Sequence, residues 1–99
     1  MMVLFHITTR AAWQAAQAAG EYRTPSLAGE GFIHLSTAKQ WPTTQARFFR
    51  DVRGLLLLVI DPARLGAEVR FERADGDDFP HLYGPLELAA VIEVRVLSE

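Results

Sequence analysis

Stretches of apolar residues separated by polar turns divide this chain into short strands. Residues 55–60, LLLLVI, contain no polar position, so they predict a strand buried on both faces at the centre of a sheet. Residues 68–72 and 91–96 alternate between apolar and polar side chains, which predicts two strands with one face in water. The apolar residues 3–5, followed by His6, predict a short opening strand.

A helix is predicted directly after this opening strand. Trp13, Ala16 and Ala19 recur at helical spacing, which predicts a helix over residues 10–19. Gly20 stands where a helix commonly ends in a left-handed turn. Trp13 is the expected core anchor of this helix.

A second helix is predicted after a turn, from about residue 42 to residue 50. Ser36 or Thr37 is the expected cap, because a short hydroxyl side chain can accept a hydrogen bond from a free N–H of the first turn. Trp41 and Phe48 lie at helical distance from each other, and core positions are favoured for both.

The remaining segments predict loops and two further strands. Residues 20–31 are rich in glycine and polar residues and are expected to form a loop that could border a pocket. Residues 32–35 and 81–83 are short strand candidates, and residues 74–78 are a turn-rich loop. The chain of residues 1–99 is therefore expected to be a single α+β domain, with two helices in its N-terminal half packed on a mixed or antiparallel sheet.

Composition and charge narrow the classes of partner. Hydrophobic residues make up 49% of the chain and charged residues 22%, which is typical of a folded domain. The net charge of −2 gives no general attraction to nucleic acid or to anionic lipid, so nucleic acid is not an expected partner. Arg47, Arg50 and Arg53 form the basic cluster of the sequence, for which a solvated helix face is the favoured interpretation.

The cellular location is inferred from absent signals. The chain has no cysteine, which suits a reducing compartment. Its longest apolar run, residues 55–60, is too short to cross a membrane, and the N-terminus lacks a basic leader. We therefore expect a cytoplasmic protein with no membrane segment.

The three histidines are the most informative feature of the sequence. They occur in FHIT, FIHLST and FPHLYG, each at or near an apolar strand candidate. A single such histidine is more simply explained as a half-buried ring whose nitrogens bond to the backbone. Three of them, with Ser36 and Thr37 directly after the second, favour a cleft that holds a sugar hydroxyl or a phosphate oxygen.

Other kinds of catalytic site are less well supported. No two histidines have the spacing that places two metal ligands on one helix face or hairpin, so no metal site is expected. Ser36 lacks the glycines of a nucleophile elbow, and the chain has no glycine-rich phosphate loop.

Glu72 and Tyr83 each have two interpretations. Glu72 stands next to Arg73, which favours an exposed ion pair, although a catalytic base stays open. Tyr83, in HLYGP, is either a packing residue whose hydroxyl is exposed to solvent or a residue whose hydroxyl contacts a ligand.

The order of the motifs resembles a known family. FHIT, EGFIHLST, LLLLVID, VRFE and FPHLYGPL follow one another as in DUF952, a family of small bacterial domains of unknown function, over nearly the whole chain. The pattern is in turn similar to the ADP-ribosyltransferase fold, and most closely to tRNA 2'-phosphotransferase. In that enzyme a strand ending in His-Gly-Thr precedes a strand that reads His-Leu-Ser; His6 and Thr8 match the first motif, and His34 to Ser36 match the second.

This resemblance implies a split sheet whose cleft holds NAD or an ADP-ribosylated group. His6 and Thr8 would lie at a ribose, and His34, Ser36 and Thr37 at the nicotinamide ribose or phosphate side. The resemblance makes His34 a catalytic residue and assigns the acceptor to His81, Tyr83 or Glu72, further along the chain.

Three functions stay open at this point. The first is an enzyme that transfers an ADP-ribosyl or phosphate-linked group, with NAD as its cofactor. The second is a binding module for a nucleotide or sugar phosphate that has the cleft without the chemistry. The third is a small interaction protein, such as a homodimer, in which the histidines are structural.

Overall fold

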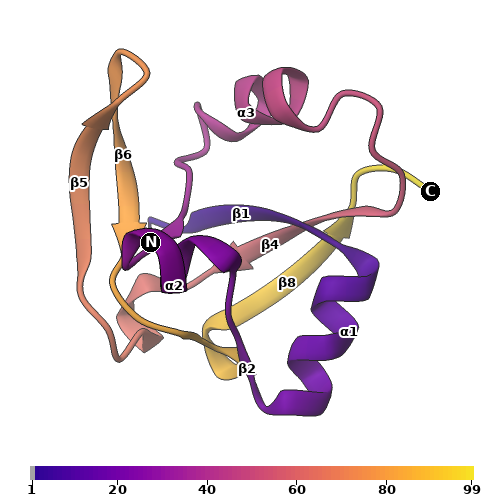
Figure 1. The fold of residues 1–99 in the computed structure, drawn as a ribbon, viewed down its shortest axis with the longest axis horizontal. Coiled ribbons are helices and arrows are strands. Elements are labelled where there is room, and N and C mark those ends of the chain that lie inside the picture. The colour runs from indigo at the N-terminus through magenta and orange to yellow at the C-terminus, as the bar shows by residue number, and fades with distance from the viewer. Residues whose placement is uncertain (1) are drawn as a thin grey trace.

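The computed structural model describes residues 2–99, which form three small antiparallel sheets and three helices (Figure 1). In chain order the elements are β1 (Leu4–Thr9), α1 (Arg10–Ala19), β2 (Glu21–Tyr22), α2 (Pro25–Glu30), β3 (Ile33–His34), α3 (Trp41–Phe48), β4 (Leu55–Ile60), β5 (Val69–Ala74), β6 (Asp77–Leu82), β7 (Leu86–Glu87) and β8 (Val91–Val96), with short 3₁₀ turns at Pro62–Arg64 and Leu88–Ala90. The expected α+β class is confirmed. Every strand pair within residues 2–99 is antiparallel, so the mixed alternative is not what forms.

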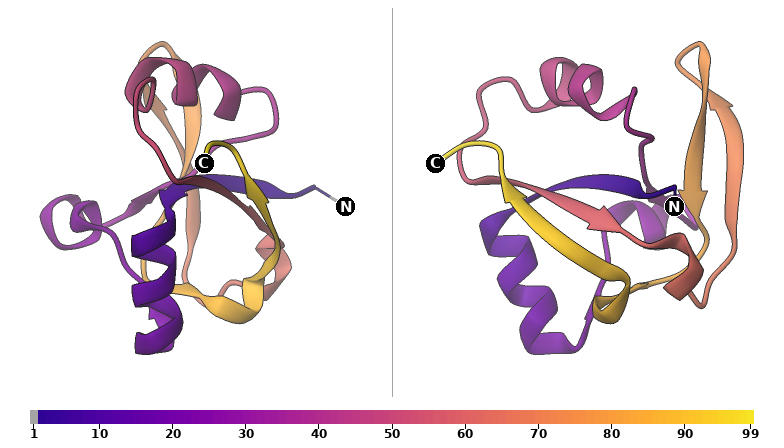
Figure 2. Two further views of the ribbon diagram at one scale, coloured as in Figure 1. Left: turned by 90° about the vertical axis from the view of Figure 1, so that its right-hand side faces the viewer. Right: turned by 180° about the vertical axis from the view of Figure 1, so that it is seen from behind.

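The central sheet has the strand order β1-β4-β8, and β4 is its middle strand. All six residues of β4 are buried, as the wholly apolar run predicts. Helices α1 and α3 lie on opposite sides of this sheet (Figures 1 and 2). Leu58 packs in the cluster that α1 covers, whereas Leu57 packs in a second cluster with Trp41 of α3, so β4 contributes to the core on both faces.

The second sheet, β3-β6-β5, is built around a long hairpin. β5 and β6 pair from Val69↔Leu82 to Ala74↔Asp77, and Asp75 and Gly76 make the turn with positive φ angles of 51° and 82°. An Asp-Gly pair is a common two-residue hairpin turn. The expected loop at 74–78 is therefore mostly strand, and the expected short strand at 81–83 is the end of β6.

Residues 20–31 are not the loop that their composition predicts. They contain β2 and the short helix α2. Pro25 occupies the first turn of α2, where its missing N–H costs nothing, and Gly31 ends the helix at φ 92°. Proline and glycine here delimit a helix, so residues 2–99 contain three helices where the pattern predicts two.

Helices α1 and α3 fall close to their predicted positions. Thr9 caps α1 by accepting a hydrogen bond from the N–H of Ala12, and Gly20 ends it. Trp13 is half-buried against the core. Phe48 is 59% exposed, so its predicted core position is wrong: it lies at the end of α3, on the side facing the cavity described below.

Candidate functional site

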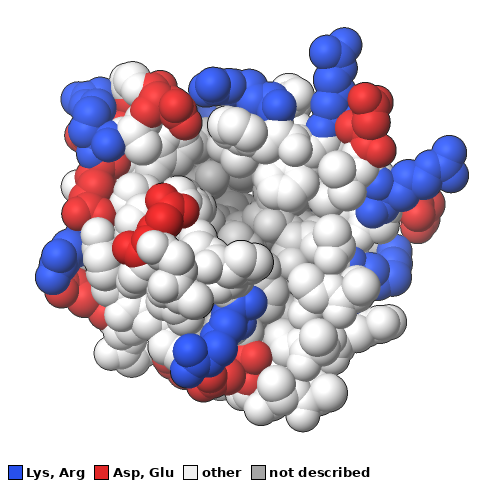
Figure 3. Space-filling model, viewed as in Figure 1, with Lys and Arg blue, Asp and Glu red and all other residues white. Residues whose placement is uncertain are grey.

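A cavity of about 630 Å³ lies between α2, α3 and the β5–β6 hairpin. All three histidines of the chain line it, from β1, β3 and β6. Figure 3 shows the hollow on this face of the molecule, with uncharged side chains at its floor and charged ones around it. This volume falls in the range of small-molecule binding sites.

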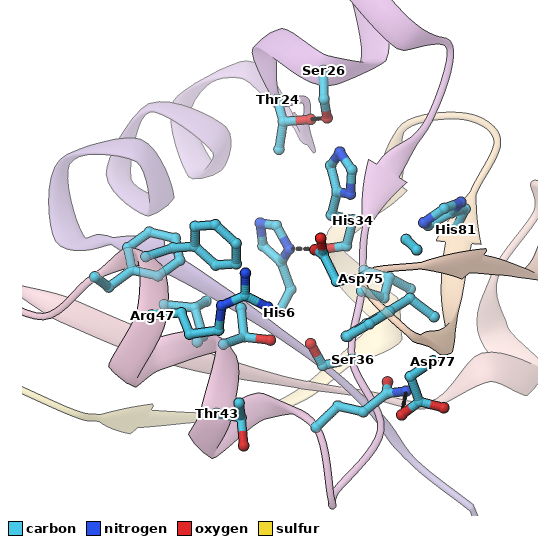
Figure 4. Close-up of a pocket in the computed structure, with 18 of the residues that line it drawn as sticks. His6, Thr24, Ser26, His34, Ser36, Thr43, Arg47, Asp75, Asp77 and His81 are labelled. Atoms are coloured by element: carbon cyan, nitrogen blue, oxygen red, sulfur yellow. Dashed lines mark hydrogen bonds between the residues drawn. The ribbon is translucent and has the colours of Figure 1, made fainter.

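His6 has both ring nitrogens engaged inside the protein. Its Nδ1 donates a hydrogen bond to the carbonyl oxygen of His34 over 2.7 Å (Figure 4), and its Nε2 lies 2.8 Å from the hydroxyl of Tyr22. Burial lowers the pKa of His6 from 6.5 to about 4, so the ring is neutral near pH 7. Because a carbonyl can only accept, the single ring proton sits on Nδ1 and Nε2 acts as an acceptor. His6 therefore ties β1 to β3 and to β2.

Tyr22 is a residue of the site that the sequence pattern does not reveal. Its ring packs edge-on against His6 with centroids 5.2 Å apart, and its hydroxyl also lies 2.9 Å from Oγ1 of Thr8. Burial raises the pKa of Tyr22, so it stays protonated. Thr8 is buried behind Tyr22 and contributes no atom to the cavity wall.

His34 and His81 are direct neighbours across the β3–β6 pair. Their rings meet edge to face, 5.4 Å apart between centroids, and Phe32 stacks on His81 at 4.0 Å. The two histidines differ in burial. The side chain of His34 is 54% exposed, and its Nε2 lies 3.0 Å from the Glu30 carboxylate, whereas His81 is 5% exposed.

Glu72 does not form the exposed ion pair with Arg73 that their adjacency favours. Arg73 pairs with Asp78, while Oε1 of Glu72 lies 2.8 Å from Nδ1 of His81 and accepts a hydrogen bond from the Tyr83 hydroxyl. The Tyr83 and His81 contacts hold the pKa of Glu72 below its ordinary value, and the Glu72 carboxylate raises the pKa of Tyr83. Glu72 and Tyr83 lie behind His81, away from the cavity wall.

The hairpin register brings these groups together. β5–β6 pairing sets Arg70 opposite His81 and Glu72 opposite Phe79, which makes Glu72 a diagonal neighbour of His81 on one face of the sheet. The signal for this contact is present in the sequence as the Asp75-Gly76 turn, which fixes the register once it is read as a two-residue hairpin.

Ser36 and Thr37 have different positions. Ser36 is buried on the cavity wall, and its backbone forms two 2.8 Å hydrogen bonds with Phe5, which joins the two larger sheets. Thr37 lies off the wall. Its N–H donates to Oε1 of Gln40 over 2.9 Å, and its carbonyl accepts from the N–H of Trp41, so it organises the turn before α3.

Gln40 joins this turn to the hairpin tip. Its side-chain amide donates to Oδ2 of Asp77 over 2.9 Å (Figure 4) and to the carbonyl of Asp78 over 2.8 Å. The Gln40 hydrogen bond holds the pKa of Asp77 below its ordinary value, so the carboxylate is ionised at neutral pH. Gln40 thus fixes two walls of the cavity relative to each other.

The positive charges near the cavity are unpaired. Six of the ten Lys and Arg side chains lie within 4.0 Å of a carboxylate, and they are spread over the rest of the molecule. Within residues 2–99, the four that form no such pair all fall in one segment that includes α3: Lys39, Arg47, Arg50 and Arg53. Lys39 and Arg47 line the cavity, together with the hydroxyls of Thr24, Ser26 and Thr43.

The part of the chain that the structure describes contains no group of three or more His, Asp or Glu side chains placed to hold a metal ion. None of the helices in residues 2–99 is long and apolar enough to cross a membrane.

Comparison with known proteins gives the family. The profile described as "Protein of unknown function (DUF952)" matches residues 7–94. The chain belongs to the DUF952 family. A crystal structure of protein CC0527 from Caulobacter crescentus is similar, with a TM-score of 0.87 and 35% identity over 95% of this chain and 84% of that one. The solution NMR structure of CC0527 has a TM-score of 0.84 and 36% identity over 99% of this chain and 86% of that one. No protein of curated function matches the chain.

Proposed function

We propose that the cavity binds a nucleotide with a diphosphate group, as in NAD or ADP-ribose. The observation that carries this proposal is the concentration of unpaired cations in residues 39–53, two of which, Lys39 and Arg47, line the cavity. In a chain with a net charge of −2, cations without carboxylate partners are available to an anionic ligand.

The opposite side of the cavity has the opposite charge. Asp75 and Asp77, at the tip of the hairpin, line it across from α3, and His34 and Ser36 lie between the two sides. NAD has both a negatively charged diphosphate and a positively charged nicotinamide ring. It therefore complements a cleft with a basic and an acidic side, with the ribose hydroxyls at the histidine and serine side chains.

In the enzyme form of this proposal, a hydroxyl or a phosphate of the acceptor forms a bond to C1' of the nicotinamide ribose of NAD, while the bond from C1' to nicotinamide breaks and nicotinamide leaves. His34 and His81, which line the cavity, would contact the reacting groups, and Glu72 and Tyr83, behind His81, would act as positioning residues. His6 acts through the contacts that it makes with His34 and Tyr22. A binding module with the same cleft would bind the nucleotide and release it unchanged, so product formation separates the two forms.

Calorimetric titration with NAD, ADP-ribose and AMP tests the proposal. We expect saturable binding of the two diphosphates and weaker binding of AMP. Arg47→Gln and Lys39→Gln should each weaken binding by about tenfold, which corresponds to one charge-assisted hydrogen bond. Arg95→Gln is the matched control, because Arg95 pairs with Glu93 on β8 and is not part of the cavity wall. No binding at millimolar concentration, or equal losses in all three variants, would reject the proposal.

A further inference from the structure

His81 has one ring nitrogen that the protein leaves without a partner. Its Nε2 is buried and has no hydrogen-bond partner within residues 2–99. A buried polar atom in this state is destabilising, and such atoms are rare in folded proteins. Because His81 also lines the cavity, an occupant of the cavity can supply the missing bond once the atoms that cover Nε2 move.

The Glu72 contact decides what Nε2 can bind. An ionised carboxylate only accepts hydrogen bonds, so the 2.8 Å contact between Oε1 of Glu72 and Nδ1 of His81 requires the proton on Nδ1. In the neutral ring, Nε2 then has a free lone pair. The Tyr83 hydroxyl donates to the same Oε1 and Phe32 stacks on the imidazole, which together hold the ring in place.

We infer that His81 Nε2 is a subsite that accepts a hydrogen bond from a neutral donor on the ligand, namely a ribose hydroxyl, with Glu72 as the residue that fixes its tautomer. This inference rests on the proposed nucleotide cleft. It assigns the sugar of the ligand to the β6 side of the cavity, whereas Lys39 and Arg47 bind the diphosphate.

Access to Nε2 depends on the side chain of His34. The ring that packs edge-on against His81 is that of His34, which is 54% exposed. In residues 2–99 the side chain of His34 makes one hydrogen bond, to the equally exposed Glu30. The His34 ring also packs edge-on against Phe32, with centroids 4.8 Å apart. We expect a rotamer change of this exposed side chain to open the path to His81.

The ring nitrogen shifts of ¹⁵N-labelled protein, measured by NMR at about pH 8, test the tautomer without any ligand. We expect the proton of His81 on Nδ1 in the wild type. In Glu72→Gln the side-chain amide can donate to Nδ1, so the proton should move to Nε2, and the affinity for ADP-ribose should fall by about tenfold or more. Glu93→Gln, which alters an exposed carboxylate on β8, should change neither quantity. Amide spectra report whether each variant is folded.

Two probes separate this inference from the nucleotide proposal. D-ribose has hydroxyl donors and no phosphate, so it should shift Nε2 of His81 in the wild type and not in Glu72→Gln. A shift of His81 Nε2 with D-ribose, in a protein that does not bind ADP-ribose, would support the ribose subsite and reject the proposal that the cavity binds a nucleotide. If Glu72→Gln leaves ADP-ribose binding unchanged, the ribose subsite at His81 is rejected, while the proposal that the cavity binds a nucleotide stands. A wild-type His81 with its proton on Nε2 would also overturn the inference.

Discussion

The buried His6 should make the fold sensitive to mild acid. Its pKa is lowered from 6.5 to about 4 because burial penalises the charged ring, and this outweighs the hydrogen bond to the His34 carbonyl, which acts in the opposite direction. Between these two pKa values the unfolded chain binds a proton at His6 that the folded protein does not. The free energy of unfolding therefore rises with pH through this window and falls on acidification.

The size of this effect follows from the pKa difference. Each pH unit within the window is worth about 1.4 kcal/mol, so acidification from about pH 7.5 to pH 5 should cost about 2 kcal/mol through His6 alone. Over the whole window the cost approaches about 3 kcal/mol. Tyr22, which contacts the ring, stays protonated in this range because burial raises its pKa. The coulombic influence of His34 acts in the same direction as burial and lowers the pKa of His6. Carboxylates with lowered pKa values, such as Glu72, affect the free energy of unfolding in a more acidic range, because their contribution is lost as the pH falls through the lowered pKa.

Urea unfolding of the wild type and of His6→Asn at several pH values measures how much His6 contributes to the pH dependence of the free energy of unfolding. Asparagine can keep a donor near the His34 carbonyl but does not titrate. The variant should be less stable at about pH 7.5 because it loses the contact with Tyr22, and the gap between the two proteins should narrow by about 2 kcal/mol at about pH 5. A gap that stays constant with pH would refute the reasoning, as would an NMR titration that puts the pKa of His6 near 6.5.

Three further substitutions test the packing. Leu57→Ala removes a wholly buried side chain from β4 and should lower the free energy of unfolding by about 2–5 kcal/mol in urea; a loss below about 1 kcal/mol would contradict its burial. Gly84→Ala would place a Cβ 2.6 Å from Cβ of Ala67, so we expect a loss of about 1–3 kcal/mol that Ala67→Gly relieves in the double variant, and additive effects would argue against this contact. Gln40→Ala should speed amide hydrogen exchange at Thr37, because it removes the Gln40 side-chain oxygen that accepts a hydrogen bond from the Thr37 N–H. An unchanged exchange rate would show that this hydrogen bond does not slow exchange at Thr37.

The elements that the sequence predicts well are those set by local pattern. β4 is identified by a run of apolar residues that only a buried central strand accommodates, and α1 by its helical spacing and its terminal glycine. The secondary structure of residues 20–31 is harder to predict, because proline and glycine occur both in loops and at the ends of a short helix. Phe48 shows the limit of periodicity, since helical spacing does not say which face of α3 meets the sheet.

The candidate site depends on contacts that local pattern does not report. That the histidines lie near strands is visible in the sequence, but the hydrogen bond from His6 to His34 spans 28 positions along the chain, and the partner Tyr22 comes from a two-residue strand. The Glu72–His81 contact could be deduced from the hairpin register, because the turn at residues 75–76 sets it. The unpaired cations could not be recognised from the sequence, since the pairing of the other arginines depends on the fold.

The three histidines differ in the number of ring nitrogens that the protein itself satisfies. Both nitrogens of His6 have internal partners, so a change there should act on the free energy of unfolding and on its pH dependence. His81 has one internal partner and one buried nitrogen without any, and His34 reaches into solvent, so changes at these two should act on ligand affinity. Two histidines that line the same cavity therefore need not have the same role. Measuring both stability and ligand affinity for substitutions at His6 and His81 distinguishes a residue that stabilises the fold around the site from one that contacts the ligand.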